Sequence, residues 1–315
     1  MRLVFMGTPN FAVASLEALL KSDDSIVGVV TQPDRPKGRG QILTPSPVKL
    51  LAQRQQIPLL QPLKMKDPEF LQTLADWKPD LIAVAAFGRI LPPVILSLPP
   101  LGCINVHGSL LPKYRGAGPI QWAIINGERE TGITTMLMDE GMDTGAMLLQ
   151  EAIPITSTDT ADTLAPRLAE LGGRLLVETI ARLKAGTLAP QPQDTSQATF
   201  APLLKKEDGV IDWALPATAL ANRVRGLSPW PGAYTTVAGG DRWTIWRALA
   251  LPGPVTKPPG TIIAVTTEAI HVATGEGVLA VMELQPTNSR RMAVSQYLTG
   301  HPTAVGLQLG GPVRS

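Results

Sequence analysis

The chain has 315 residues, of which 44% are hydrophobic and 17% charged, a formal net charge of +2 and a single cysteine. This length accommodates two domains, and the composition is that of a globular protein, not a disordered one. The apolar runs are far too short to cross a bilayer, and one cysteine excludes an intramolecular disulfide. Because the chain begins directly with a strand-like run and has no leader sequence, we expect a cytoplasmic protein.

Apolar runs alternate with helical patterns through the first 140 residues. Strands are predicted at 2–7, 25–32, 57–62, 80–87, 102–108 and 132–138, and helices at 11–23, 46–56, 67–78 and 119–127, with Asp67 as an N-cap. This alternation predicts an α/β domain with a Rossmann-like, mainly parallel sheet, whose ligands bind at the carboxyl ends of the strands.

A long amphipathic pattern over residues 160–186 predicts a helix that closes this first domain. We place the domain at residues 1–188 and a linker rich in Pro, Gln, Ser and Thr at 189–206. Residues 207–315 form the second domain, where a short helix precedes five short strands separated by Gly, Pro and Asp. That spacing predicts a small, OB-like β-barrel.

The first strand-to-helix turn reads MGTPNFA and lacks the G-x-G-x-x-G pattern of dinucleotide-binding folds. This absence argues against a nicotinamide-dependent dehydrogenase. Gly7 does not by itself indicate a phosphate-binding turn, because a tight turn favours glycine for structural reasons.

Asn105 and His107 are two residues apart in the predicted strand 102–108, so their side chains project from the same face about 6–7 Å apart. An amide donor and an imidazole together suit the stabilisation of an oxyanion that develops on a carbonyl. Cys103 shares this face but lies about 13 Å from His107, too far for a thiol nucleophile and its base. The alternative is a hydrogen-bonded core histidine beside a capping asparagine.

Asp143 lies in the Gly-rich loop DEGMDTG that follows the strand 132–138. If the carboxyl end of that strand adjoins His107, the carboxylate orients the imidazole and favours its protonated form. The alternative is a solvated turn in which Asp serves the turn itself. We expect no metal, because Asp139, Glu140 and Asp143 lack the spacing of a calcium loop and the other two histidines lie in the second domain.

The stretch NVHGSLLPKYRGAGPIQWAIINGERETGITTMLMDEGMDTG resembles the 10-formyltetrahydrofolate-dependent formyltransferases, with Asn105, His107 and Asp143 at the family's catalytic positions. Three further stretches, FMGTPNFA, QPDRPKGRGQ and NRVRGLSPWPGAY, resemble the members that act on initiator methionyl-tRNA. The resemblance implies transfer of a formyl group from 10-formyltetrahydrofolate, as co-substrate, to the amino group of that methionine. It also implies translation initiation as the process and a tRNA-binding second domain, and we expect a monomer.

The resemblance further implies where the folate binds. The pterin should lie against backbone groups of residues 89–91, beside the wall formed by residues 109–112 and against the loop that contains Asp143. The expected residues are Arg89, Ile90, Leu91, Ser109, Leu110, Leu111, Pro112, Asp139 and Gly141. For the apolar members of this set, a place in the hydrophobic core is the competing explanation.

The segment 31–48 is long for a connection between a strand and a helix. Arg35, Lys37 and Arg39 alternate there with Pro and Gly and face one acid, Asp34. We expect a mobile arm that contacts tRNA phosphates or bases. The alternative is a solvated surface loop.

Other activities share these motifs. The same stretches also resemble formyltransferases that act on an amino group of a nucleotide-linked sugar or of a ribonucleotide. A hydrolase that releases formate from formyltetrahydrofolate is a different class, but the family's hydrolases have a regulatory domain before the catalytic one. A non-catalytic folate or RNA binder has no need for all three polar residues together.

Overall fold

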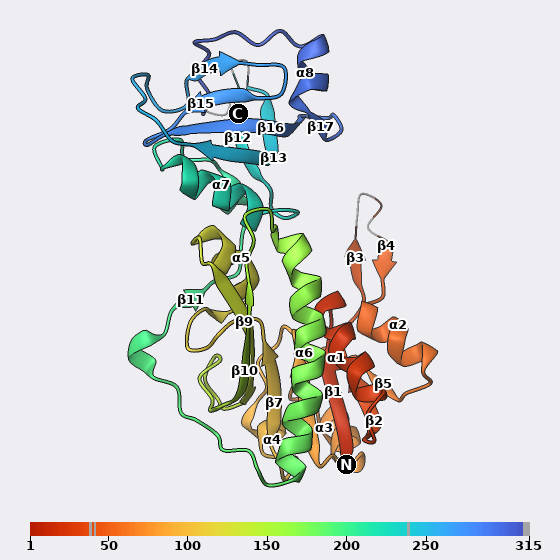
Figure 1. Ribbon diagram of the computed structural model, residues 1–315. Coiled ribbons are helices and arrows are strands. Elements are labelled where there is room, and N and C mark those ends of the chain that lie inside the picture. The colour runs from red at the N-terminus through yellow and green to blue at the C-terminus, as the bar shows by residue number, and fades with distance from the viewer. Residues whose placement is uncertain (38–39, 41, 238–239, 311–315) are drawn as a thin grey trace. The chain divides into compact units, whose positions relative to one another are not determined.

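Residues 1–37, 40, 42–237 and 240–310 are described by a computed structural model. The chain divides into two units (Figure 1). The first unit contains residues 1–119, 130–154 and 165–202, and the second contains 120–129, 155–164 and 203–315. Each unit is described by itself.

The first unit is built on a seven-stranded sheet with the order β10-β9-β7-β6-β1-β2-β5. Its strands are β1 (Arg2–Gly7), β2 (Ser25–Val30), β5 (Leu59–Leu60), β6 (Leu81–Ala85), β7 (Cys103–His107), β9 (Glu130–Leu137) and β10 (Met147–Pro154). Five strands from β7 to β5 run parallel, whereas β9 is antiparallel to β7 and β10 is antiparallel to β9. Every residue of β6 is buried, as expected for a strand covered on both faces.

Helices cover this sheet: α1 (Asn10–Leu20), α2 (Pro47–Arg54), α3 (Pro68–Asp76), the short α4 (Pro93–Leu96) and α6 (Ala161–Lys184). The predicted N-cap is confirmed, because the Asp67 carboxylate accepts hydrogen bonds from the backbone N–H groups of Glu69 and Phe70. In Figure 1, α6 runs along the sheet beside α1. Gly172 permits this approach, since a Cβ there would lie 2.8 Å from Cγ1 of Val106 on β7.

The segment 31–48, expected to be a loop, contains an antiparallel hairpin. Strand β3 (Arg35–Lys37) pairs with β4 (Ile42–Thr44), and Arg35 lies opposite Thr44. Ile42 and Leu43 on β4 are 71% and 66% exposed. The sequence did not predict this hairpin, because its strands are only three residues long and lack the alternation of buried and exposed residues that marks a strand.

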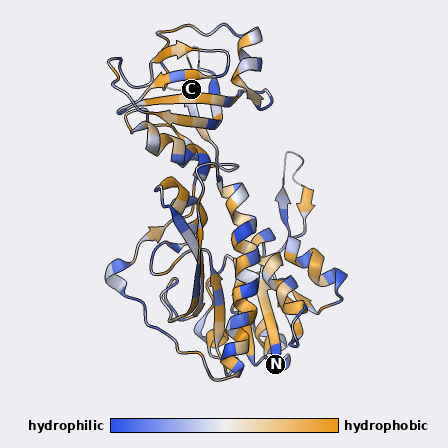
Figure 2. Cartoon of the chain, viewed as in Figure 1, coloured by the Kyte–Doolittle hydropathy of each residue, from blue (hydrophilic) through white to orange (hydrophobic). Residues whose placement is uncertain are grey.

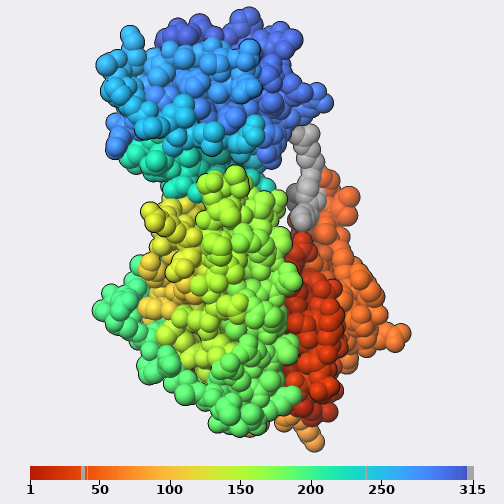
Figure 3. All heavy atoms as spheres, in the orientation of Figure 1, coloured from red at the N-terminus to blue at the C-terminus, as the bar shows by residue number. Residues whose placement is uncertain are grey.

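The segment after α6, expected to be a linker, is paired with the first unit. A short 3-10 turn, η1 (Thr195–Gln197), is followed by β11 (Phe200–Ala201), which pairs in parallel with β8 (Arg115–Gly116). In the space-filling view, the residues that follow α6 lie on the surface of the unit (Figure 3). The segment after α6 bonds to residues of the first unit that are far away in sequence, so no local periodicity predicts these bonds.

The second unit contains an antiparallel sheet with the order β12-β13-β16-β15-β14, and β17 pairs with β16. Its elements are α5 (Pro119–Ile125), η2 (Lys206–Gly209), α7 (Ala217–Gly226), β12 (Ala233–Thr236), β13 (Arg242–Leu251), β14 (Ile262–Val265), β15 (Ile270–Ala273), β16 (Val278–Pro286), β17 (Met292–Ala293) and α8 (Val294–Gly300). The fold class expected from the sequence, a mainly parallel α/β domain followed by a separate antiparallel β domain, is confirmed.

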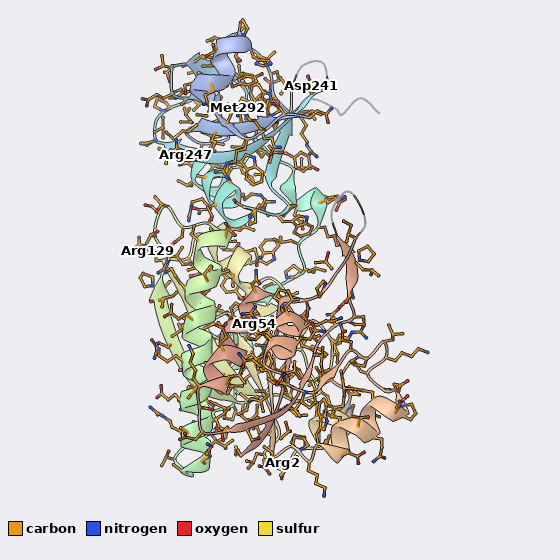
Figure 4. The ribbon with its side chains drawn as sticks, turned by 90° about the vertical axis from the view of Figure 1, so that its right-hand side faces the viewer. Arg2, Arg54, Arg129, Asp241, Arg247 and Met292 are labelled. Atoms are coloured by element: carbon orange, nitrogen blue, oxygen red, sulfur yellow. The ribbon has the colours of Figure 1, made fainter. Side chains whose placement is uncertain are left out.

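A bulge at Arg247 in β13 interrupts the strand's alternation of buried and exposed residues. The register shifts on either side of Arg247, so that Ile245 and Ala248 are both buried while Arg247 is exposed (Figure 4). Coloured by hydropathy, β1 is largely orange, whereas α6 carries both blue and orange residues along its length (Figure 2). That mixture is the mark of a helix with one face in the core.

Candidate active site

His107 ends strand β7 and its imidazole is 5% exposed. Its Nε2 lies 2.9 Å from the carbonyl oxygen of Tyr114, and its Nδ1 lies 3.6 Å from Oδ2 of Asp143. Because a carbonyl only accepts, Nε2 must carry a proton. A lone pair on Nδ1 would then face the carboxylate, whereas a proton there would be attracted to it. Each ring nitrogen of His107 therefore faces an oxygen, Nε2 the Tyr114 carbonyl and Nδ1 the Asp143 carboxylate.

Asp143 reaches His107 by a route different from the expected one. The prediction relied on β9 ending at the same sheet edge as β7, and this is wrong because the two strands are antiparallel and Leu137 pairs with Ile104 at the start of β7. The loop between β9 and β10 instead folds back and places the carboxylate at the imidazole. Asp143 itself has φ +55°, in the left-handed region.

Asn105 lies on the same face of β7 and is half-buried. Among the described residues, its side-chain amide has no hydrogen-bond partner in the protein. A half-buried amide that is not used by the fold is available to bind a ligand, which distinguishes Asn105 from a capping asparagine.

The loop after β7 supplies two backbone groups to this arrangement. Tyr114, with φ +62°, presents its carbonyl to His107, and the N–H of Gly116 donates to Oδ2 of Asp143 at 2.8 Å. Position 116 requires glycine, because φ is +119° and a Cβ would lie 2.7 Å from the Ala201 carbonyl oxygen. The Asp143 carboxylate is thus held by both the imidazole and the backbone.

The expected folate wall at residues 109–112 is largely internal. The Ser109 hydroxyl is buried and donates to the Lys113 carbonyl at 2.6 Å, and Leu111 is 2% exposed and joined to Pro112 by a cis peptide bond. Thr134 on β9 fixes this loop, since its hydroxyl donates to the Ser109 carbonyl and accepts from the Leu111 N–H. Leu110 is half-buried. Contact of these residues with folate stays a prediction.

A cavity of 290 Å³ lies at residues 90–93, the region that follows β6. Its lining includes two of the expected residues, Ile90 and Leu91, together with Glu140 from the loop that contains Asp143; the remaining lining residues are Met65, Lys66, Pro92 and Pro93. Ile90 is 81% exposed, a large apolar side chain left open at the edge of the cavity. Apolar walls with a few polar groups fit a planar, partly polar ring system.

The other expected folate residues serve local structure. The Arg89 guanidinium donates to the Leu63 carbonyl at 2.7 Å. The Asp139 carboxylate accepts from the N–H of Gly141 and from the hydroxyl of Thr144, which closes the turn before Asp143. The side chains of Arg89 and Asp139 are thus engaged within the protein. Binding of folate by the backbone of residues 89–91 stays a prediction.

Cys103 cannot supply a thiolate at this site. Its thiol lies in the hydrophobic core of the first unit, and burial raises its pKa to about 12. This agrees with the sequence argument against a cysteine nucleophile.

The three basic residues predicted to contact tRNA are described to different extents. The Arg35 guanidinium donates to Oε1 of Gln32, and among the described residues no carboxylate pairs with it. Lys37 is described only in its backbone, and Arg39 lies outside the described residues. The one acid of the segment, Asp34, is 2.6 Å from Nζ of Lys49, and this ammonium, with the Gln61 amide, holds the pKa of Asp34 below its usual value.

Sequence reasoning missed several groups that hold the site: the Tyr114 carbonyl, the Gly116 N–H, the Thr134 hydroxyl and the side chain of Gln193. The glycine in KYRG was the one visible signal, because a Gly after a basic residue in a Pro-punctuated loop often marks an unusual backbone conformation. Backbone groups carry no sequence signature of their own.

Comparison with known proteins decides the family. A sequence profile described as "Formyl transferase" matches residues 1–180, and a second, described as "Formyl transferase, C-terminal domain", matches residues 203–302. The chain belongs to the formyltransferase family. The resemblance noted from the sequence is therefore confirmed.

Within this family, the chain is 51% identical over 98% of its length to "Methionyl-tRNA formyltransferase" of Trichlorobacter lovleyi, 96% of which is covered. It is 52% identical to the protein of the same name from Pelotomaculum thermopropionicum, over 98% of this chain and 99% of the relative. A crystal structure of an N-formyltransferase from Helicobacter canadensis, solved with folinic acid and dTDP-3-aminofucose, matches with a TM-score of 0.66, 20% identity, and coverage of 92% and 99%. That likeness shows a shared fold.

Two further observations concern only the described part of the chain. No helix in it combines the length and apolar character needed to span a bilayer. No group of three His, Cys, Asp or Glu side chains in it is arranged to bind a metal ion, and a metal-independent site stays a prediction.

Proposed function

We propose that this formyltransferase transfers the formyl group of 10-formyltetrahydrofolate to the α-amino group of methionine esterified to initiator tRNA. The observation that supports this acceptor is the identity of about half of all residues, over nearly the whole chain, with relatives named methionyl-tRNA formyltransferase. The chemistry is supported by the convergence of His107, Asp143 and the unpartnered Asn105.

In the proposed reaction, the amine nitrogen attacks the formyl carbon and the carbonyl becomes a tetrahedral oxyanion. The Asn105 amide and the Nε2–H of His107 donate hydrogen bonds to that oxyanion. The new C–N bond is kept as the bond to N10 of the folate breaks. The attacking amine loses one proton and N10 gains one, so the exchange is balanced, and Asp143 and His107 are the groups placed to move them.

The Tyr114 carbonyl has a specific part in this proposal. It accepts a hydrogen bond from the Nε2–H of His107 when no substrate is present, so the oxyanion must compete with this carbonyl for the same proton. A negatively charged oxygen is a stronger acceptor than a neutral carbonyl. The imidazole is therefore held by the weaker partner in the ground state and by the stronger one as charge develops, which is the order that transition-state stabilisation requires.

The folate is proposed to bind across the cavity lined by Ile90, Leu91 and Glu140. This places the pterin beside the loop that carries Asp143. The expected contacts with Arg89, Asp139, Gly141 and residues 109–112 belong to this same proposal. We also propose that Arg35, Lys37 and Arg39 of the segment 31–48, together with the second domain, contact the tRNA.

We propose that the two predicted domains have separate functions: residues 1–188 catalyse formyl transfer and residues 207–315 bind tRNA. The enzyme would act as a monomer in the cytoplasm, where initiator tRNA is charged. The deciding experiment incubates the protein and 10-formyltetrahydrofolate with charged initiator tRNA, charged elongator methionyl-tRNA, a nucleotide-linked amino sugar, or buffer, and measures release of tetrahydrofolate.

Rapid release with initiator tRNA alone supports the proposal. Release with the amino sugar instead would assign the chain to a small-molecule amine, and equal release in buffer would assign it to hydrolysis. Each outcome leaves a different product, N-formylmethionyl-tRNA, a formylated sugar or free formate, so the product identifies the acceptor independently of the rate.

A further inference from the structure

A segment that follows α6, here called the connecting segment (residues 191–201), belongs to the first unit and is bonded along its length to the rest of that unit. At one end, Gln191 and Met147 exchange two backbone hydrogen bonds of 2.8 Å. At the other end, β11 pairs with β8, and the Gly118 N–H donates to the Ala201 carbonyl at 3.1 Å. Between these anchors, two side chains of the segment reach the loops that flank His107.

Gln193 joins those two loops through its side-chain amide. Its Nε2 donates to the carbonyl oxygens of Asp143 and Gly145, both at 2.8 Å. Its Oε1 accepts from Nε and Nη2 of Arg115 at 3.0 and 2.8 Å. Arg115 is 4% exposed, so this amide oxygen satisfies a buried charge. Both donor hydrogens of the amide and both acceptor positions of its oxygen are used.

Thr199 holds the other side of the imidazole. Its hydroxyl oxygen accepts from the Tyr114 N–H at 2.8 Å, and its carbonyl accepts from the Arg115 N–H at 2.9 Å. The Tyr114 carbonyl is the group that binds Nε2 of His107. The hydroxyl of Thr199 therefore fixes the peptide unit immediately before the residue that positions the imidazole.

Tyr114 and Asp143 both contact the His107 ring, and both adopt positive φ without being glycine. Such a conformation is unfavourable for a residue other than glycine and persists only where surrounding contacts impose it. The connecting segment makes those contacts: Thr199 binds the N–H of Tyr114, and Gln193 binds the carbonyl of Asp143. Neither side chain fills the core, because Gln193 is half-buried and Thr199 is exposed.

We infer that Gln193 and Thr199 are positioning residues for the catalytic His107–Asp143 pair, which makes the connecting segment part of the active site. The inference rests on the proposed formyl transfer. Gln193 sets the loop of the carboxylate, and Thr199 sets the loop of the carbonyl that competes for the Nε2 proton. Neither residue needs to touch the formyl group or the folate.

The test uses the full-length protein with Gln193→Ala, Gln193→Glu, Thr199→Val and Thr199→Ser. Gln193→Glu keeps the acceptors for Arg115 but removes the donors to Asp143 and Gly145, so it separates the two functions of the amide. Thr199→Ser keeps the hydroxyl. Gln197→Ala is the matched control, because Gln197 lies on the same segment, is exposed, and donates from its side-chain amide to Asp194 in its own turn.

We expect Gln193→Ala, Gln193→Glu and Thr199→Val to lower kcat by about 10–100-fold, because displacement of a reacting group by about 1 Å costs that much. KM for the folate and for tRNA should stay within about threefold, since the binding surfaces are intact. Thr199→Ser and Gln197→Ala should retain the wild-type kcat. In an Asp143→Ala background, Gln193→Ala should add less than about threefold, because it acts through that carboxylate.

Normal kcat in Gln193→Ala and Thr199→Val would overturn the inference. So would a loss confined to KM, or a loss in Gln193→Ala that is fully additive with Asp143→Ala, because either result would indicate binding or general stability instead of positioning. The wild-type reaction separates this inference from the proposed function: if wild type fails to formylate initiator methionyl-tRNA, the proposed function is wrong whatever the variants do.

Discussion

Nδ1 of His107 lies 3.6 Å from Oδ2 of Asp143, although the strands that precede these residues run in opposite directions. The approach of the two groups therefore depends on the loop between β9 and β10 and not on the sheet. The loop is closed by Asp139, which binds Gly141 and Thr144, and its far side is held by Gln193. A carboxylate placed by a loop is sensitive to the hydrogen bonds that hold that loop.

Asp143→Asn should lower kcat by about 10²–10³-fold, because the amide keeps the shape of the carboxylate but removes its negative charge beside Nδ1 of His107. The Gly116 N–H can still donate to the amide oxygen, so the loop should stay in place. Single-turnover formylation measures this. Asp76→Asn is the control, because Asp76 is exposed at the end of α3 and accepts from Gln72. Unchanged turnover in Asp143→Asn would remove the electrostatic role of the carboxylate.

Replacing the basic residues of the segment 31–48 together, with Arg35→Ala, Lys37→Ala and Arg39→Ala, should weaken the use of tRNA but not the binding of 10-formyltetrahydrofolate. The slope of log affinity against log salt should fall by about 0.7–0.9 for every phosphate that the variant no longer neutralises. Arg54→Ala with Lys21→Ala is the control, since both residues are exposed charges of the same unit. If the triple variant keeps the wild-type salt slope, the hairpin does not contact phosphates.

Cys103→Ala should keep kcat within about twofold, because the thiol is in the core and takes no part in the proposed chemistry. The native thiol should resist iodoacetamide at a pH of about 8.5, where the thiol of an unfolded chain is reactive.

The pKa of the Cys103 thiol is raised from 9.0 to about 12, so its contribution to the free energy of unfolding is complete below pH 9 and falls as pH rises toward 12. Wild type should lose this increment between those pH values, and Cys103→Ala should not. Loss of activity in Cys103→Ala, with the fold intact, would contradict this assignment.

Patterns with a clear physical period were sufficient for much of the fold. Buried strands such as β6 are continuous apolar runs, Asp67 precedes a helical pattern as an N-cap, and the strands of the second unit are separated by turn residues. The i, i+2 spacing of Asn105 and His107 likewise placed both on one face of β7. These features depend on neighbours in sequence, which is why a sequence reveals them.

Features that depend on distant partners were not predictable in the same way. The direction of β9 is decided by its pairing with β7, and the apolar pattern of a strand is the same in either direction. Gln193 lies in a stretch without periodicity, and its four bonds go to residues about 50 to 80 positions away. Tyr114 contributes a backbone carbonyl, so its side chain does not reveal its role.

Formyl transfer at His107 and Asn105 can be tested by single-turnover formylation of initiator methionyl-tRNA with wild type, His107→Ala and Asn105→Ala, with folate affinity and thermal unfolding measured on the same samples. Wild type should form N-formylmethionyl-tRNA. Each variant should be slower by about 10²–10⁴-fold with near-normal folate affinity, and the double variant should be little slower than either one, because the two side chains stabilise the same oxyanion. Failure of wild type to formylate this tRNA, or a well-folded His107→Ala protein with a rate within about tenfold of wild type, would contradict the proposed mechanism.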